Sequence, residues 1–167
     1  MPRSIEQLID YCALNGIGGP ISCEGCTVDE IQALEQANGV SLPRSYREFL
    51  LNMGHGACNL FAHDHAIVNY NEAMTLVNEL PERIAGERRY RNGDFEFDMQ
   101  LPGDSLLIGS RLGDWHWYIQ CSETDDPPVW TFGITGQHGA QVQNESFVEW
   151  LFGWATEARM ALDQSQN

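Results

Sequence analysis

The feature that most constrains the fold is a pair of short helices predicted between Thr27 and Gly56. Thr27 and Glu30 have the spacing of a capping box, in which the hydroxyl caps a backbone N–H and the glutamate reaches back. An apolar stripe at helical spacing follows, and Gly39 ends this helix because glycine adopts the left-handed conformation readily. Pro43 suits the first turn of the second helix, whose apolar face is Tyr46, Phe49, Leu50 and Met53. These residues have structural roles, and none is obliged to do chemistry.

Three further helices are predicted from caps and apolar periodicity. Ser4 and Ser146 each stand three residues before a Gln or Glu, at the starts of an N-terminal helix and a C-terminal helix. Asn71 can cap a helix that we expect to end before Pro81, because proline lacks the N–H that a helix interior needs.

Short strand candidates lie between and after these helices, at residues 59–62, 66–70, 105–109, 115–121, 129–132 and 140–143. Residues 115–121 alternate with a period of two, as expected of a strand with two different faces. Asn92-Gly93 predicts a hairpin over residues 87–99 through a type I′ turn, with a helix over 82–91 as the alternative.

Short turns between consecutive strands favour antiparallel pairing. We therefore predict an α+β fold: an antiparallel sheet of about five to six strands, with N-terminal and C-terminal helices packed on one side. One domain is expected over residues 1–167, with its core at about 27–160. Residues 1–26 form the N-terminal helix and a glycine-rich connection, and residues 161–167 form a polar tail.

The charge of the chain is strongly one-sided. It has 24 acidic residues and 9 basic ones, all of them arginine, which gives a net charge of −15. Such a field repels nucleic acid and anionic membranes and favours a basic partner, although it also serves solubility alone. No signal-peptide core or apolar membrane span is evident, which indicates a cytoplasmic protein, and five cysteines do not suggest a disulfide framework.

The order of these features resembles the SUKH superfamily over roughly residues 27–155. The residues that carry the resemblance are Ile31, Leu34-Glu35, Gly39, Leu42-Pro43, Tyr46, Phe49-Leu50, Gly54 and Gly56, then Gly109, Gly113, Pro128-Val129-Trp130, Ser146-Phe147 and Trp150-Leu151. That family includes fungal cell-wall-assembly regulators and bacterial immunity proteins of polymorphic toxin systems. The resemblance implies an α+β fold and a protein-binding role, and it brings no catalytic residues with it.

The resemblance and the charge together predict a non-catalytic immunity protein without a cofactor, monomeric on its own, that neutralises a cognate basic toxin such as a nuclease. The alternatives are a regulatory scaffold without a toxin partner and a small structural-metal-binding domain. Acidic and aromatic side chains suit contact with a basic partner. The candidates are Asp94, Glu96, Asp98, Asp114, Trp115, Glu123, Asp125, Asp126 and His55.

One cysteine pair has metal-ligand spacing. Cys23-x-x-Cys26 could combine with His55 and Cys58 into a structural zinc site. Against this, the second pair does not repeat the first, so we expect no metal as the primary interpretation. Gly18-Gly19-Pro20 before the motif disfavours a thioredoxin-like redox site, which needs a preceding strand.

Overall fold

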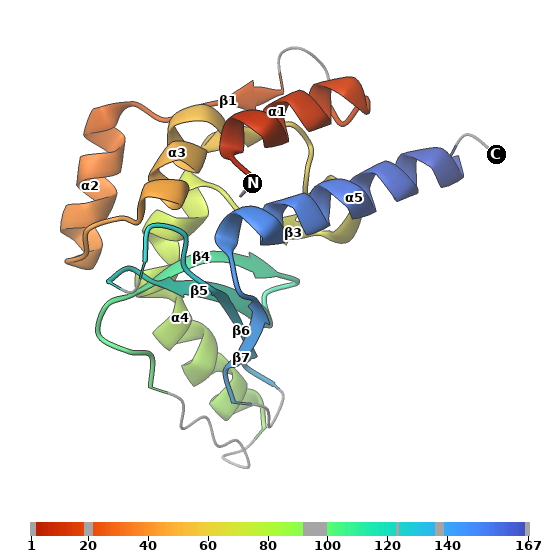
Figure 1. Cartoon of the computed structure of the whole chain (residues 1–167). Helices are drawn as coiled ribbons and strands as arrows, with labels where there is room; N and C mark the ends of the chain where they lie inside the picture. Colours follow the sequence, from red (N-terminus) through yellow and green to blue (C-terminus); the bar gives the residue numbers. More distant parts are fainter. Residues whose placement is uncertain (1–2, 19–21, 92–99, 123, 136–138, 166–167) are drawn as a thin grey trace.

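The computed structural model describes residues 3–18, 22–91, 100–122, 124–135 and 139–165. Figure 1 shows helices gathered around a sheet, in an order that begins and ends with a helix. The first half contains α1 (Ile5–Leu14), β1 (Cys23–Glu24), α2 (Val28–Asn38), α3 (Arg44–Met53), β2 (Gly56–Ala57), a 3₁₀ turn (Ala62–Asp64) and β3 (Ala66–Ile67). The second half contains α4 (Tyr70–Tyr90), β4 (Ser105–Arg111), β5 (Trp115–Gln120), β6 (Val129–Gly133), β7 (Gln141–Asn144) and α5 (Phe147–Ser165).

The strands form two antiparallel sheets. The larger has the order β3-β4-β5-β6-β7, and the smaller pairs β1 with β2. Because neighbours in the larger sheet follow one another in sequence, its longer strands are joined by short connections. The predicted α+β class and antiparallel sheet are confirmed.

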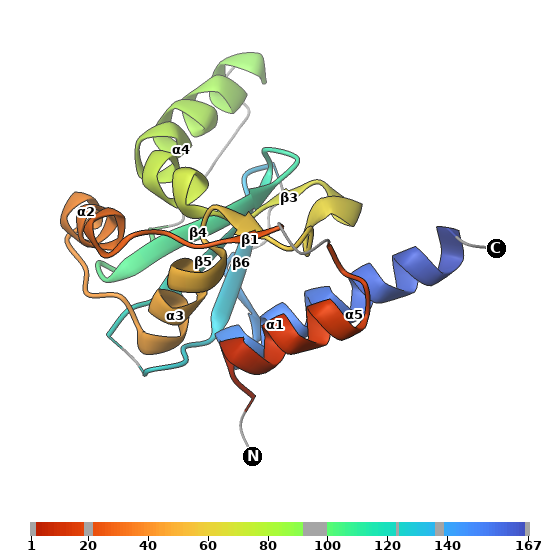
Figure 2. The ribbon, with the colours of Figure 1, turned by 90° about the horizontal axis from the view of Figure 1, so that it is seen from above.

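The two faces of the larger sheet are covered by different helices. Figure 2 shows α1, α3 and α5 on one face and α4 on the other. Trp117 and Ile119 of β5 belong to the large core shared with α1, α3 and α5. Tyr118 belongs to a smaller cluster in which Leu76 and Leu80 of α4 pack on the opposite face. The period of two in β5 thus separates two cores, and the terminal helices lie on one side as predicted.

Local hydrogen bonds explain where the N-terminal helices begin and end. Ser4 and Thr27 both make complete capping boxes, with Gln7 and Glu30 as the reciprocal partners. Gly39 ends α2 in the left-handed conformation, at φ 65°. Each of these features follows the sequence prediction, because capping depends on residues only three or four positions apart.

The predicted end of the fourth helix is wrong. Asn69, not Asn71, caps α4, and the helix continues through Pro81 to Tyr90. The hydrogen bond that Pro81 cannot donate would have gone to Val77, four residues earlier, and both residues lie on the exposed side. Water can solvate that carbonyl, so the interruption is tolerated. The first residues of the predicted 87–99 hairpin are therefore helical, and residues 92–99 lie outside the described ones.

Two shorter predictions also differ from the structure. The segment predicted as a strand over 59–62 is instead a turn that enters the 3₁₀ turn at Ala62, because Cys58 and Asn59 both adopt positive φ. The C-terminal helix continues to Ser165, so most of the predicted polar tail is helical. Among the described helices, none has an apolar stretch long enough to cross a bilayer.

Candidate functional site

The acidic residues predicted to bind a partner do not form one patch in the described structure. Asp114 and Trp115 lie at the start of β5, whereas Asp125 and Asp126 lie in the loop after it. A strand of this length separates the two pairs by roughly 20 Å. Asp94, Glu96, Asp98 and Glu123 lie outside the described residues.

Two of these carboxylates accept hydrogen bonds within the chain. Asp114 accepts from the backbone N and the hydroxyl of Thr135, at 2.7 and 2.6 Å. Asp126 accepts from the Ser146 hydroxyl at 2.5 Å and from the Val148 N at 3.1 Å, at the N-terminus of α5. Trp115 and Asp125, by contrast, are exposed. These two are the better placed of the four for contact with another molecule.

A groove lies between α5 and the sheet face that α5 covers. It encloses about 380 Å³, and its floor is formed by Trp117 of β5 with Trp150 and Trp154 of α5. The Trp117 and Trp154 rings meet nearly at right angles, at 86° and 5.7 Å between centroids. Trp117 Nε1 donates to Gln143 Oε1 at 2.6 Å, which ties the floor to β7. The floor is therefore aromatic, and its three rings are packed against one another and almost fully buried.

The rim of this groove is polar and carries acids. Asp64, Arg111, Gln143, Asn144 and Glu157 line it. Arg111 pairs with Asp64 at 2.7 Å, whereas the Glu157 side chain is 59% exposed and meets His63 only at 3.7 Å. Trp115 lies opposite Arg111 in the β4–β5 ladder and on the same strand face as Trp117. This exposed ring thus continues the aromatic floor toward solvent.

A second concave region lies at the other face, between α4 and the β4–β5 turn. It encloses about 470 Å³ and is lined by Arg83, Gly86, Glu87, Leu112, Gly113, Asp114, Ile134 and Thr135. The fully buried His116 lies behind it, with Nδ1 3.0 Å from the Asp114 carbonyl and Nε2 3.3 Å from Arg83 Nη1. Burial, together with the Arg83 charge, lowers the pKa of His116 to about 4. The imidazole is therefore neutral, donating from Nδ1 and accepting at Nε2.

The four residues of the alternative zinc set do not converge. Cys23 and Cys58 form a disulfide with their Cα atoms 4.6 Å apart, across the junction of β1 and β2. Cys26 is free and buried, and it lies instead with His55 and with Glu30. Two of the four residues of that alternative set, Cys26 and His55, therefore lie in a different three-residue cluster.

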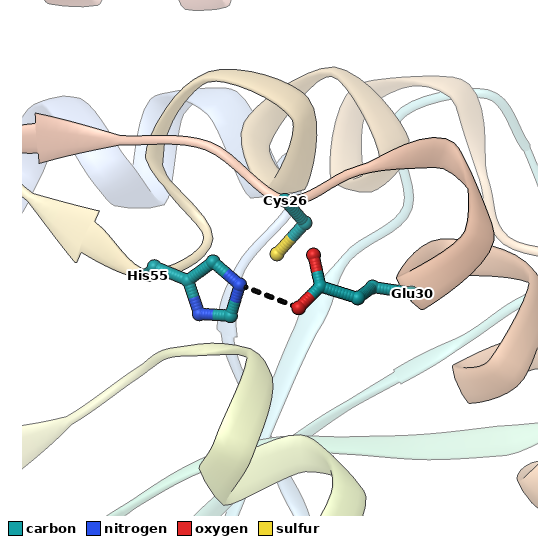
Figure 3. A group of neighbouring side chains, drawn as sticks. All are labelled: Cys26, Glu30 and His55. Carbon is teal, nitrogen blue, oxygen red and sulfur yellow. Dashed lines mark hydrogen bonds and ion pairs between the residues drawn. The ribbon is translucent and has the colours of Figure 1, made fainter.

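Cys26, Glu30 and His55 bring a sulfur, a carboxylate oxygen and a ring nitrogen within 4.8 Å of one another. Figure 3 shows the three side chains pointing toward one another from β1–α2, α2 and the segment after α3. His55 Nε2 lies 2.9 Å from Glu30 Oε1. Burial, and then the charge of Glu30, raises the pKa of the Cys26 thiol to about 11. At neutral pH this sulfur is therefore a neutral thiol.

Two glycines allow the segment before α2 to lie against the end of α3; this junction of residues 25–26 with residues 50–54 is called the corner below. A Cβ on Gly54 would lie 2.3 Å from the Cys26 sulfur, and a Cβ on Gly25 would lie 1.8 Å from the Leu51 carbonyl oxygen. The Cys26 N–H donates to the Leu50 carbonyl at 2.8 Å, which fixes the cysteine on the end of α3. The close approach therefore depends on the absence of side chains at two positions.

Sequence reasoning found Cys26 and His55 but missed Glu30, and it missed the tryptophan groove. Glu30 was assigned only to the capping box, although a carboxylate has a second oxygen that the cap does not use. The groove combines β5, β7 and α5, which come together only in the tertiary structure. A cysteine placed one residue before a capping box is the signal that could have placed Cys26 and Glu30 on one turn.

The comparison with protein families agrees with the resemblance seen in the sequence. A search of curated proteins found no relative of this chain. The family model of the SMI1 / KNR4 family (SUKH-1) matches residues 25–153, which include the three-residue cluster and seven of the nine residues that line the groove. Trp154 and Glu157 lie beyond the matched range. The match spans most of the chain and every strand of the larger sheet, so this chain belongs to the SMI1 / KNR4 family (SUKH-1).

Proposed function

We propose that this chain is an immunity protein: a non-catalytic, cytoplasmic binder that neutralises one cognate toxin with a basic surface. Family membership is the observation that carries the proposal, because the SUKH superfamily includes bacterial immunity proteins. The net charge of −15 supports a basic partner, such as a nuclease whose cleft binds phosphates.

The proposed interface is the tryptophan groove together with Trp115. An exposed aromatic ring beside carboxylates suits a lysine or arginine side chain, which gains both a cation–π contact and an ion pair. Glu157 is available for this role because more than half of its side chain is exposed. The tryptophan rings of the floor are already packed and buried, so binding would remove little conformational entropy from them.

The function is tested with the protein encoded by the adjacent reading frame. We expect a stoichiometric complex with that protein and survival of cells that express both, whereas expression of the toxin alone stops growth. Absence of both binding and rescue contradicts the immunity role. Recovery of several weakly bound partners instead of one tight partner would favour the regulatory scaffold.

The interface is tested by two matched pairs of variants. Trp115→Ala should weaken the complex by at least about 30-fold, as expected for an anchoring residue worth 2 kcal/mol or more. Tyr90→Ala removes another exposed aromatic ring, on α4, and should leave affinity unchanged. Glu157→Arg should weaken binding strongly, whereas Glu82→Arg on α4 makes the same charge change away from the groove. Equal effects within each pair would place the interface elsewhere.

A further inference from the structure

We propose that Cys26, Glu30 and His55 form a binding site for one Zn²⁺ ion, with a water molecule as the fourth ligand. The juxtaposition itself carries the inference, since the three possible ligand atoms come from three segments and lie within 4.8 Å of one another. The proposal is independent of toxin binding, and its test needs no partner protein.

The chemical types of the three side chains fit zinc. Thiolate, carboxylate and imidazole are all common zinc ligands, and a thiolate in the set disfavours the hard cations Mg²⁺ and Ca²⁺. When the ion binds, the thiol of Cys26 releases its proton to solvent, so thiolate and carboxylate together carry two negative charges. These balance Zn²⁺, so the site becomes neutral around the buried Cys26 sulfur.

The distances need only small side-chain adjustments. With ligand bonds of about 2.0–2.3 Å, neighbouring ligand atoms around a tetrahedral zinc ion lie roughly 3.3–3.8 Å apart. The His55 Nε2 to Glu30 Oε1 distance of 2.9 Å is slightly shorter than this, and the other separations extend to no more than 4.8 Å. Rotation of the side chains is enough to place all three atoms around one point.

The surroundings of the cluster hold the ligands in place. Glu30 Oε2 accepts from the N and the hydroxyl of Thr27, at 2.8 and 3.0 Å, so the capping box orients the carboxylate and leaves Oε1 facing His55. The backbone N–H of His55 donates to the Glu24 carbonyl at 2.8 Å, which fixes the main chain at His55, and the ring of Tyr70 packs edge-on against the imidazole. Such outer contacts usually accompany metal ligands and fix their orientation.

Solvent can reach the fourth position. The side chains of His55 and Glu30 are 24% and 35% exposed, whereas Cys26 is buried. In the part of the chain that the structure describes, this is the one group of three or more Cys, His, Asp and Glu side chains with such geometry. Three protein ligands and an open position leave room for water.

The test begins with metal-free protein in an oxygen-free buffer without reductant, which keeps Cys26 unoxidised and leaves the Cys23–Cys58 disulfide intact. Titration with Zn²⁺ should reach one ion per chain and raise the melting temperature, because the ion binds the folded state. Titration with Co²⁺ should produce thiolate-to-cobalt charge-transfer absorption and the visible bands of tetrahedral cobalt. Binding of less than about one ion per chain, or a cobalt spectrum without the thiolate band, overturns the proposal.

Single substitutions then identify the ligands. Cys26→Ser, Glu30→Gln and His55→Asn should each weaken Zn²⁺ binding at least about tenfold. Glu30→Gln is the most informative, because glutamine preserves the capping box while removing the charged ligand. The matched controls Cys121→Ser, Glu48→Gln and His63→Gln lie outside the cluster and should bind as the unmodified chain does.

One more substitution distinguishes the proposed site from the alternative set of four zinc ligands. If zinc is held by Cys23, Cys26, His55 and Cys58, Cys58→Ser abolishes binding and Glu30→Gln does not, which overturns the three-residue site. If Glu30→Gln loses zinc and Cys58→Ser retains it, the proposed site is supported. Circular dichroism of each variant establishes that it is folded, and Glu30→Gln keeps the test decisive if Cys26→Ser fails to fold.

Discussion

At the scale of single residues, His116 shows how burial assigns a protonation state. Its ring is fully buried and stacks on Phe132, with centroids 5.3 Å apart. Nδ1 faces a carbonyl and Nε2 faces the Arg83 guanidinium, which is itself paired with Glu79 at 2.7 Å. A proton on Nε2 would point at a cation and have no acceptor, so the folded state holds the neutral ring.

This arrangement predicts that the protein loses stability as the pH falls from about 6.5 to 4. The unfolded chain takes up a proton near the ordinary pKa of 6.5, whereas folded His116 takes it up only near pH 4. The unfolded state therefore binds more protons in this window, and the free energy of unfolding decreases with falling pH, by up to about 3 kcal/mol from this residue. Urea unfolding at pH 7, 5.5 and 4 measures the effect.

The variant His116→Gln isolates the contribution of this ring from that of the carboxylates. It should be less stable at pH 7, because Arg83 and Asp114 lose well-placed partners, yet its stability should fall less between pH 7 and 4 than that of the unmodified chain. The exposed His65→Asn is the matched control, since asparagine tolerates the positive φ of 54° at that position. Identical pH profiles for His116→Gln and the unmodified chain would contradict a neutral buried imidazole.

At the scale of elements, the corner where the start of α2 meets the end of α3 depends on a close backbone approach that only glycine permits. Gly54 has an ordinary helical φ of −67°, so its requirement is steric rather than conformational. A Cβ there would lie 2.3 Å from the Cys26 sulfur and 2.7 Å from the Leu50 carbonyl oxygen. Both atoms belong to well-packed parts of the corner and have little room to move.

We therefore expect Gly54→Ala to lower the free energy of unfolding by about 1–3 kcal/mol, as is typical of overpacking. Gly86→Ala is the matched control: it lies inside α4 with no atom within 4 Å of the added Cβ. Because alanine favours helix, this second substitution should raise the free energy of unfolding by about 0.5–1 kcal/mol. Thermal or urea unfolding compares the two, and equal stabilities would show that the corner relaxes around the added methyl group.

The elements that the sequence predicts well are those defined by local interactions. Capping boxes gave α1 and α2, and alternation gave β5 and the face on which each of its residues lies. The elements it predicts poorly depend on the rest of the molecule. α4 continues through Pro81 because it packs on a sheet whose main strands follow it in the sequence. β1 pairs with β2 although two helices lie between them in the chain.

The candidate sites follow the same division. Cys26 and Glu30 share one turn, so their proximity follows from the capping box, but His55 reaches them only through the packing of α3. The groove needs Trp117 from the sheet and Trp154 from the last helix. Sequence spacing indicates which residue types are present, and tertiary packing decides which of them meet.

At the scale of the whole molecule, the net charge of −15 sets the expected kinetics of partner binding. A field from many dispersed acids acts at a distance and accelerates encounter with a basic partner, whereas contacts in the interface govern dissociation. With the toxin as partner, the association rate constant should fall at least about tenfold between roughly 0.05 and 0.5 M salt, because screening shortens the reach of the field.

Two charge-neutralising substitutions distinguish the effect of the overall charge from the effect of contacts in the interface. Glu157→Gln at the groove and Glu82→Gln on α4 change the net charge equally, so both should slow association by similar small factors. Only Glu157→Gln should also speed dissociation, because only that carboxylate is expected to contact the partner. Stopped-flow association and surface-based dissociation measurements over a salt series provide both constants. An association rate independent of salt would mean that recognition depends on the apolar floor, and Trp115 would then become the dominant anchor.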